Sequence, residues 1–501
     1  MCVKGVDVAR VIAIINEEGK RTTFTHDLVD RRKTVRDSLN DVQSFDYDAA
    51  GNLILKESPR REKTTTLVYD IADRRIGQLL ANGVVTSLSY DDANRLNEVE
   101  SRNSSSVLLS SFNYLMDPAG NRTTLTASGS DGFLWSYDKT NQLLVEQRTL
   151  SGDAFTHTMT YDPRGNRLTL SDTNIPPVSF DYDYDNANRL QTVTDVSGIT
   201  TYTYDANGNQ HTIEEPNGDI TTNTWNGENR LILVEHPDST ETVYRYNGDG
   251  LRVFQDHDGT VTLFLYDGNN LLQETDDTGL VEAAFTYIPL PYAEVLSQRR
   301  DTESSFYLPD GIRNIRQLTD DAHVITDEYA FDAFGNLRSA TGGTANSQLY
   351  KGQLLSYRND PHRGPDSQSS MHFRNQSATT FRFTSEDPAE DDLNLYRPVG
   401  NNPVNNEDPS GLEDLGHHWL VKSVFDRIPS KSITDEARQI FDAFTTKTGT
   451  YSHGFDTFFM ETSAVTHAQY NSAVETLVNA TIKNGPITRE TGSARNEVRV
   501  Q

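Results

Sequence analysis

The chain has 501 residues, of which 35% are hydrophobic, and its 45 basic and 73 acidic residues give a net charge of −28. This low hydrophobic share argues against one compact core and favours an extended or hollow repeat structure with much polar surface. Residues 413–501 contain 9 of the basic and 11 of the acidic residues, so nearly all of the net charge lies in residues 1–412. That acidic part excludes nonspecific nucleic-acid binding, because phosphates bind to cations.

Other features of the sequence exclude further classes of protein. Cys2 is the only cysteine, which excludes an internal disulfide framework. No run of 18 apolar residues occurs, so we expect no membrane span. The first 20 residues contain only a weak apolar patch, and no signal peptide is evident there.

A short turn-like sequence recurs every 20 to 24 residues through the first half of the chain. Its copies begin at Tyr47, Tyr69, Tyr90, Tyr114, Tyr137, Tyr161, Tyr184, Tyr204, Trp225, Tyr246 and Tyr266, and His26 begins a degenerate earlier copy. Self-similarity at such a period is typical of repeat architectures, in which each unit packs mainly on its neighbours.

Each copy predicts a strand, a turn and a second strand, as residues 201–213 (TYTYDANGNQHTI) illustrate. Alternating Thr and Tyr indicate a half-buried strand, and Asp205, Gly208 and Asn209 then supply turn chemistry. Most turns alternate between a Gly-Asn form and an Asn-Arg or Asn-Gln form, which would fit one turn type at each edge of a long sheet. Because Tyr and Asp recur so often, we interpret them as aromatic ladders and turn caps, not as catalytic groups.

These repeats resemble the YD repeats of bacterial Rhs proteins, of the C component of insecticidal toxin complexes and of animal teneurins. The resemblance implies a mainly β fold, a continuous sheet spiralled into a closed β-shell that encapsulates the chain's own C-terminal region. We therefore expect YD repeats in residues 1–280, the segment known as the Rhs-associated core in residues 281–412, and a small α-rich (α+β) domain in residues 413–501.

The core segment carries the most specific motif of the chain, FTSEDPAEDDLNLYRPVGNNPVNNEDPSGL, at residues 383–412. The resemblance implies that aspartates of this region, Asp387 and Asp408, cut the chain between Leu412 and Glu413. However, Asp387-Pro388 lacks the Gly-Leu that usually follows, and residues 357–380 depart from the family's aromatic-rich tract. A second interpretation, in which both aspartates only cap turns, therefore stays open.

After Leu412 the composition changes and two helices are predicted. The first runs from Ile433 to about Phe444, and the second runs from about His467 to Lys483 and ends before Gly485-Pro486. Four of the 12 histidines of the chain lie in this domain. His467 and Asn471 are four residues apart and share a face of the second helix.

The pair His417-His418 after a glycine, followed by the His467–Asn471 pair, resembles the Gly-His-His group of the HNH/endonuclease VII superfamily. The resemblance implies that His417 and His467 bind a divalent metal (Mg²⁺, Mn²⁺ or Zn²⁺). It also implies that His418 is the general base of a phosphodiester hydrolysis and that Asn471 orients the base or the metal. His453 is a further candidate.

The sequence thus predicts a polymorphic-toxin protein of bacterial type: a β-shell that contains a metal-dependent endonuclease. Its expected partners are a nucleic-acid substrate and a cognate immunity protein, and we expect a monomer that is secreted or delivered at the cell surface. The alternative is a structural or adhesive YD shell, on the cell surface or secreted, with an inactive C-terminal tail.

Overall fold

In the computed structural model of the protein, the described residues are 2–4, 11–15, 21–36, 42–58, 63–150, 152–173, 177–288, 292–351, 357–358, 368–377, 379–389, 392–412, 488–489 and 498–499. Over these ranges the chain is almost entirely β, with one sheet of 32 strands, one of four and one of two. The helical elements in the same ranges are two short 3₁₀ turns, η2 (Ser128–Ser130) and η3 (Val399–Asn401). The prediction of a mainly β fold is confirmed.

The strands of the large sheet follow one another along the chain. They are β1 (Cys2–Lys4), β2 (Val11–Ile15), β3 (Arg21–His26), β4 (Arg32–Arg36), β5 (Val42–Tyr47), β6 (Leu53–Ser58), β7 (Lys63–Tyr69), β8 (Arg75–Leu79), β9 (Val85–Tyr90), β10 (Leu96–Arg102), β11 (Leu108–Met116), β12 (Arg122–Ala127), β13 (Gly132–Tyr137), β14 (Leu143–Arg148), β15 (Phe155–Tyr161) and β16 (Arg167–Asp172). They continue as β17 (Val178–Tyr184), β18 (Leu190–Asp195), β19 (Gly198–Tyr204), β20 (Gln210–Glu214), β21 (Ile220–Trp225), β22 (Leu231–Glu235), β23 (Glu241–Tyr246), β24 (Arg252–His257), β25 (Thr260–Asp267), β26 (Asn270–Thr275), β27 (Val281–Tyr287), β28 (Val295–Arg300), β29 (Glu303–Pro309), β30 (Ile315–Thr319), β31 (Ile325–Phe331) and β32 (Leu337–Thr341).

Two small sheets follow. The four-stranded sheet contains β33 (Tyr357–Arg358), β34 (Gln368–Met371), β35 (Arg374–Ser377) and β36 (Arg382–Phe383), and the two-stranded sheet contains β37 (Thr488–Arg489) and β38 (Val498–Arg499). The two helices predicted after residue 412 lie outside the described residues.

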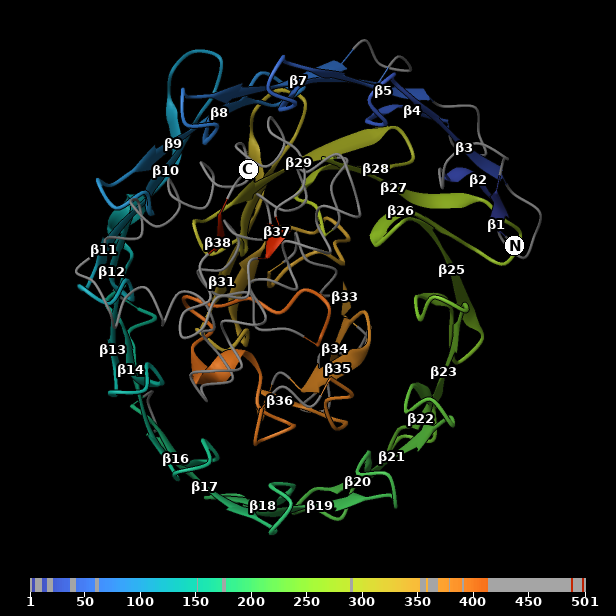
Figure 1. Ribbon diagram of the computed structural model, residues 1–501. Helices are drawn as coiled ribbons and strands as arrows, with labels where there is room; N and C mark the ends of the chain where they lie inside the picture. The colour runs from blue at the N-terminus through green and yellow to red at the C-terminus, as the bar shows by residue number, and fades with distance from the viewer. Residues whose placement is uncertain are drawn as a thin grey trace.

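The large sheet is an antiparallel meander, because each strand from β1 to β32 pairs with the next strand in the sequence. Figure 1 shows the strands from β1 to β25 following one another around a ring, with β31 and β33–β36 inside it. The repeats thus form the wall of the shell, and the sheet continues without a break into the first part of the predicted core segment.

The strands of the wall bury alternate side chains, as the period of two predicts. In β13, for example, Phe133 and Trp135 are buried whereas Leu134 and Ser136 are exposed. The buried side chains form several clusters instead of one core. One cluster joins β3–β9 to β25–β31, and a second joins β10–β16 to residues of the core segment such as Phe334.

In most YD turns a repeated aspartate, replaced by asparagine at residues 226 and 247, caps the turn. In the turn at residues 91–95, Oδ1 of Asp91 accepts hydrogen bonds from the N–H groups of Ala93 (3.0 Å) and Arg95 (2.9 Å). The N–H of Asp91 donates to the carbonyl of Arg95 (2.9 Å), and the N–H of Asn94 donates back to the carbonyl of Asp91 (2.9 Å). Asn94 adopts a φ of 66°, a conformation that Asn and Gly tolerate best. The interpretation of the aspartates as turn caps is confirmed for these repeats.

The two turn forms alternate because each fits its neighbour. The last Asn of a Gly-Asn turn donates its side-chain N–H to the positive-φ Asn of the next turn, as in Asn121–Asn141 (2.9 Å), Asn166–Asn188 (3.0 Å) and Asn209–Asn229 (2.9 Å). The arginine of an Asn-Arg turn lies over the aromatic ring of the next repeat, as in Arg189–Tyr204 (5.5 Å) and Arg230–Tyr246 (5.7 Å).

Both turn forms lie at the same edge of the sheet, so the expectation of one form at each edge is wrong. Every YD turn joins an odd-numbered strand to the following even-numbered strand, for example β9 to β10 and β11 to β12. In a meander all such turns fall on one edge. We call this edge the YD edge.

The repeated aromatic residue connects neighbouring repeats. Its polar group donates to a main-chain carbonyl in the preceding repeat, as in Tyr90 to Arg75 (2.8 Å), Trp225 to Gln210 (2.7 Å) and Tyr246 to Leu231 (2.8 Å). Since each of these bonds joins residues 15 positions apart, the wall is held by the same contact repeated along the chain.

Replacing Tyr246 with phenylalanine should destabilise the wall locally by about 0.5–1.5 kcal/mol, the usual net contribution of one hydrogen bond. The carbonyl of Leu231 would lose its partner while the ring stays in place. Hydrogen exchange of β22 and β23 in the full chain would measure the change. As a control, Thr203→Val removes a hydroxyl from an exposed Thr203–Thr212 pair and should have an effect below about 0.5 kcal/mol.

Candidate functional site

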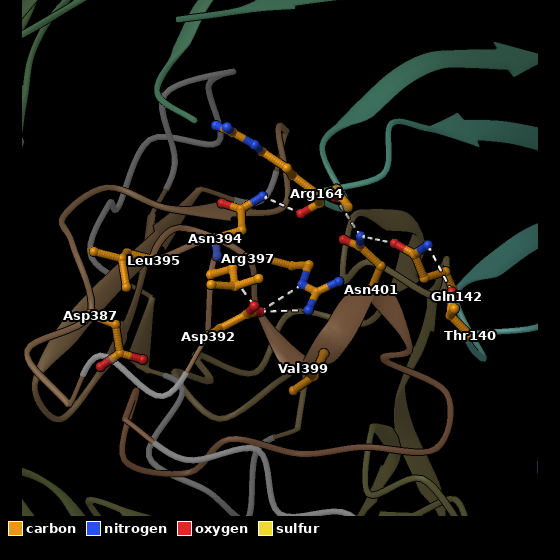
Figure 2. A network of polar contacts seen from close by, with 12 residues as sticks. Thr140, Gln142, Arg164, Asp387, Asp392, Asn394, Leu395, Arg397, Val399 and Asn401 are labelled. Carbon is orange, nitrogen blue, oxygen red and sulfur yellow. Dashed lines mark hydrogen bonds and ion pairs between the residues drawn. The ribbon is translucent and has the colours of Figure 1, made fainter. Parts of the chain in front are cut away.

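The core segment closes over the YD edge. The side chain of Asn394 donates to the carbonyl of Arg164 (3.2 Å), and the side chain of Asn401 donates to Oε1 of Gln142 (2.9 Å) and to the carbonyl of Gly165 (2.7 Å). Figure 2 shows this network between the segment and the turns of the wall. The asparagine-rich sequence therefore continues the amide ladder of the repeats across the end of the sheet.

Lys351 anchors the same segment just before Asp408. Its buried Nζ donates to the carbonyls of Pro403 (2.7 Å) and Asn406 (3.4 Å). Burial lowers the pKa of Lys351 to about 8, against the opposing charge of Glu407. These contacts fix the backbone that leads into Asp408.

The core segment can approach the wall closely only because residue 208 is a glycine. Gly208 has a φ of +80°. The hydroxyl of Tyr396 donates to its carbonyl at 2.7 Å, and a Cβ at this position would lie 2.6 Å from that hydroxyl oxygen and 2.5 Å from Oε1 of Glu386. Gly208→Ala should therefore displace the core segment from the wall and cost about 1–3 kcal/mol. Increased hydrogen exchange at residues 392–406 would report the displacement.

Gly218 offers a matched control for that variant. It has a φ of +88°, but nothing lies within 4 Å of a Cβ added there. Gly218→Ala carries the same kind of backbone strain and should leave exchange at residues 392–406 unchanged. Equal effects of the two variants would contradict the assigned contact.

Asp387 and Asp408, the two aspartates singled out by the sequence, meet at one arginine. Nη2 of Arg374 contacts Oδ2 of Asp387 at 3.0 Å and Oδ2 of Asp408 at 3.4 Å. The three residues are 8%, 5% and 5% exposed for Asp387, Asp408 and Arg374, respectively. The Arg374 guanidinium also lies 3.5 Å over the ring of Phe383. We call these three charged residues the Asp-Arg-Asp cluster.

Each aspartate of the cluster also stabilises a turn with its other oxygen. Oδ1 of Asp408 accepts from the N–H groups of Gly411 (2.8 Å) and Leu412 (3.0 Å), and Oδ1 of Asp387 accepts from the N–H of Ala389 (2.9 Å). The second interpretation of the sequence, in which both aspartates cap turns, therefore holds for the Oδ1 atom of each aspartate. The Oδ2 atoms converge on Arg374, which capping alone does not require.

The cluster and its neighbours bind the backbone of residues 410–412, immediately before the predicted cleavage site. Nε of Arg374 donates to the carbonyl of Gly411, Nη1 donates to the carbonyl of Leu395 (3.0 Å), and the N–H of Phe373 donates to the carbonyl of Ser410 (3.0 Å). Leu412 is thus held by Asp408 directly before Glu413, which lies outside the described residues.

This arrangement contains the groups that peptide hydrolysis uses. One carboxylate can take a proton from water, a second carboxyl group can give one to the leaving nitrogen, and a nearby guanidinium can stabilise negative charge on the carbonyl oxygen. Their burial strengthens such interactions because little water screens them.

Arg374 is the member of the cluster that the sequence did not identify. It lies in residues 357–380, the tract that departs from the family pattern, and it is far along the chain from Asp408. The only signal was an arginine within a β-rich stretch shortly before the FTSEDP motif, which is too general to assign a role.

The predicted nuclease residues, His417, His418, His453, His467 and Asn471, lie outside the described residues, so their arrangement stays a prediction. Among the residues that the structure does describe, no group of three or more His, Cys, Asp or Glu side chains could hold a metal ion. In the same part of the chain, no helix is long and apolar enough to cross a membrane.

Comparison with known proteins agrees with the repeat assignment. The Teneurin YD-shell family model matches residues 108–288. The chain is 28% identical over 421 residues to the tRNA3(Ser)-specific nuclease WapA of Bacillus spizizenii, and 28% identical over 439 residues to the tRNA nuclease WapA of Bacillus subtilis. These matches cover 79% and 83% of this chain but only 16% of each relative, so the chain spans a small part of their length.

Solved structures share the fold. The TcdB2-TccC3 crystal structure has a TM-score of 0.66 at 20% identity, over 78% of this chain and 22% of the other. A Photorhabdus luminescens Tc holotoxin pore with a TccC3 mutation has a TM-score of 0.60 at 18% identity, over 79% of this chain and 21% of the other.

The repeats, the continuous sheet and these matches show that the chain has the fold of a YD-repeat β-shell. Within that fold, the chain is similar to the two WapA proteins over most of its own length.

Proposed function

We propose that the chain is a toxin shell of the Rhs type that contains a nuclease in residues 413–501 and frees it by cutting itself after Leu412. The observation that carries this proposal is the Asp-Arg-Asp cluster, in which Arg374 binds the carbonyl of Gly411 and Asp408 binds the N–H of Leu412. The names of the two relatives, both called tRNA nucleases, support a nucleic-acid substrate.

In the proposed reaction, water adds across the bond between Leu412 and Glu413. The hydroxyl joins the carbonyl carbon of Leu412, a proton joins the nitrogen of Glu413, and that bond breaks. Asp387 and Asp408 divide the two proton transfers between them. Arg374, which already binds the carbonyl of Gly411, lies one residue from the oxygen that carries the developing charge.

The freed domain would use a divalent metal. His417 and His467 would bind the ion, His418 would take the proton of the attacking water, and Asn471 would orient the base or the metal, with His453 as a further candidate. The metal would supply polarisation of the phosphate and stabilisation of the leaving oxygen. An immunity protein against this domain and delivery to another cell, after secretion or at the cell surface, belong to the same proposal.

The test is expression of residues 413–501 inside bacterial cells. Arrest of growth by the wild-type segment, and normal growth with a His418→Ala segment, would support the proposal. Normal growth in both cases, together with binding of the intact protein to cell surfaces, would favour an adhesive shell instead.

A further inference from the structure

Away from the Asp-Arg-Asp cluster, three ionisable side chains meet inside the wall. Glu146 of β14, His157 of β15 and Asp172 of β16 are direct cross-strand partners. Glu146 and His157 are 1% and 3% exposed. Nε2 of His157 lies 3.3 Å from Oδ2 of Asp172, and its Nδ1 lies 3.5 Å from Oε2 of Glu146. The longer contact exceeds an ordinary hydrogen bond and is mainly electrostatic.

The same two carboxylates hold the β31–β32 hairpin against the wall. The N–H of Ala333, in the turn of that hairpin, donates to Oε2 of Glu146 at 2.9 Å. Arg338 of β32 lies 3.6 Å from Oδ2 of Asp172. The hairpin is part of the core segment, and the hydroxyl of Tyr350, further along that segment, donates to the carbonyl of Ala333 at 2.8 Å. His157 therefore lies between the two anchors of this hairpin.

We propose that Glu146, His157 and Asp172 form a pH-sensitive latch: the protonated imidazole holds the two anchoring carboxylates in place, and loss of its proton releases the β31–β32 hairpin from the wall. Without the imidazolium, Glu146 would be a buried carboxylate beside other acidic groups. Removing one partner of a buried ion pair is strongly destabilising, because the remaining charge has neither water nor a counter-ion.

The charged surroundings of His157 favour its proton. The ionisable groups that face the latch are Glu146 on β14, Asp172 and Arg167 on β16, Asp332 in the hairpin turn, Arg338 on β32, and Tyr350. Burial opposes protonation of His157, but its contact with Glu146 and the charges of Asp332, Glu146 and Asp172 together raise its pKa. Burial also raises the pKa of Glu146, against the opposing effect of His157.

The raised pKa values of His157 and Glu146 both make the closed latch less stable as the pH rises. A group whose pKa is raised in the closed state contributes stability that is present below its ordinary pKa and is lost as the pH rises through the raised value. For His157 the ordinary value is 6.5, so the latch is closed below this pH and loosens as the pH rises above it. The raised pKa of Glu146 adds to this direction, because its ionised form is the costly one in the closed state.

Hydrogen exchange of the full chain between pH 5.5 and 9 tests the latch. After correction for the intrinsic pH dependence of exchange, opening of residues 325–341 should increase by about tenfold for each unit by which the pKa of His157 is raised. Residues 231–246, in a part of the wall away from the latch, should show no such increase. A hairpin that follows this reference segment at every pH would overturn the proposal.

Two variants separate the latch from a merely structural histidine. His157→Gln cannot gain or lose a proton in this range, so the part of the hairpin's pH dependence that follows the imidazole should disappear. Glu146→Gln leaves the imidazole but removes a charge that raises its pKa, so the transition should move to lower pH. His211→Gln, whose ring contacts the carbonyl of Asn223 elsewhere on the wall, is the control and should behave like the wild type. A wild-type transition in either latch variant would contradict the assignment.

Discussion

Asp408→Asn is expected to leave the chain uncut, with a rate of self-cleavage about 10²–10⁴ times lower than that of the wild type. This range is the usual contribution of general acid–base catalysis. The asparagine can still accept the N–H groups of Gly411 and Leu412, which Asp408 binds at 2.8 and 3.0 Å, so the turn should persist. What it loses is the carboxylate that contacts Arg374 and exchanges a proton. A time course of denaturing gels after synthesis would measure the rate.

Asp387→Asn should have a similar effect, because Oδ2 of Asp387 reaches the same arginine nitrogen. Asp392→Asn is the matched control. Asp392 lies in the same segment and forms an ion pair with Arg397 at 2.6 Å (Figure 2), so the variant tests loss of a carboxylate outside the cluster. Cleavage of Asp408→Asn at the wild-type rate, or equal loss in Asp392→Asn, would reject the cluster as the catalytic site.

His418→Ala is expected to abolish nucleic-acid hydrolysis by residues 413–501, again by about 10²–10⁴, since it removes the predicted general base. His417→Ala and His467→Ala should lose metal binding as well as rate, because a missing ligand weakens the metal site. The assay should test plasmid DNA and tRNA as substrates, each in the presence of Mg²⁺, Mn²⁺ or Zn²⁺. Metal binding is measured by calorimetry, and a chelator should stop the wild-type reaction.

The intact chain should be much less active than the freed segment. Nearly all of the net charge of −28 lies in residues 1–412, and a negative surface repels polyanions. Activity of the Asp408→Asn chain should therefore stay low until the shell is unfolded. A segment that binds no metal and cuts neither DNA nor RNA would contradict the nuclease assignment while leaving self-cleavage intact.

The wall could be predicted from the sequence because its chemistry is local. In most YD turns an Asp or Asn bonds to N–H groups two and four residues later, as Asp91 does, and this short-range pattern is visible in one repeat. The edge at which the turns lie could not be predicted in this way. It depends on the pairing of every strand with its successor, and each repeat contributes two strands, so all the YD turns fall on one edge.

The two charged clusters could not be predicted from the sequence, because each depends on contacts between residues that are far apart in the chain. Asp387 and Asp408 belong to a recognisable sequence motif. Arg374 joins them only because β35 passes beside the last turn of the core segment. No role was predicted for His157, since its partners lie on neighbouring strands and the hairpin that they hold comes much later in the chain. The predicted nuclease residues rest on a motif alone.

The most direct test of self-cleavage is the intact mass of the purified wild-type protein. The proposed reaction predicts two products that together add one water to the chain, one ending at Leu412 and the other beginning at Glu413, which remain associated until the protein is denatured. A single uncut chain under native conditions, or a break at another bond, would contradict release of residues 413–501 by the Asp-Arg-Asp cluster.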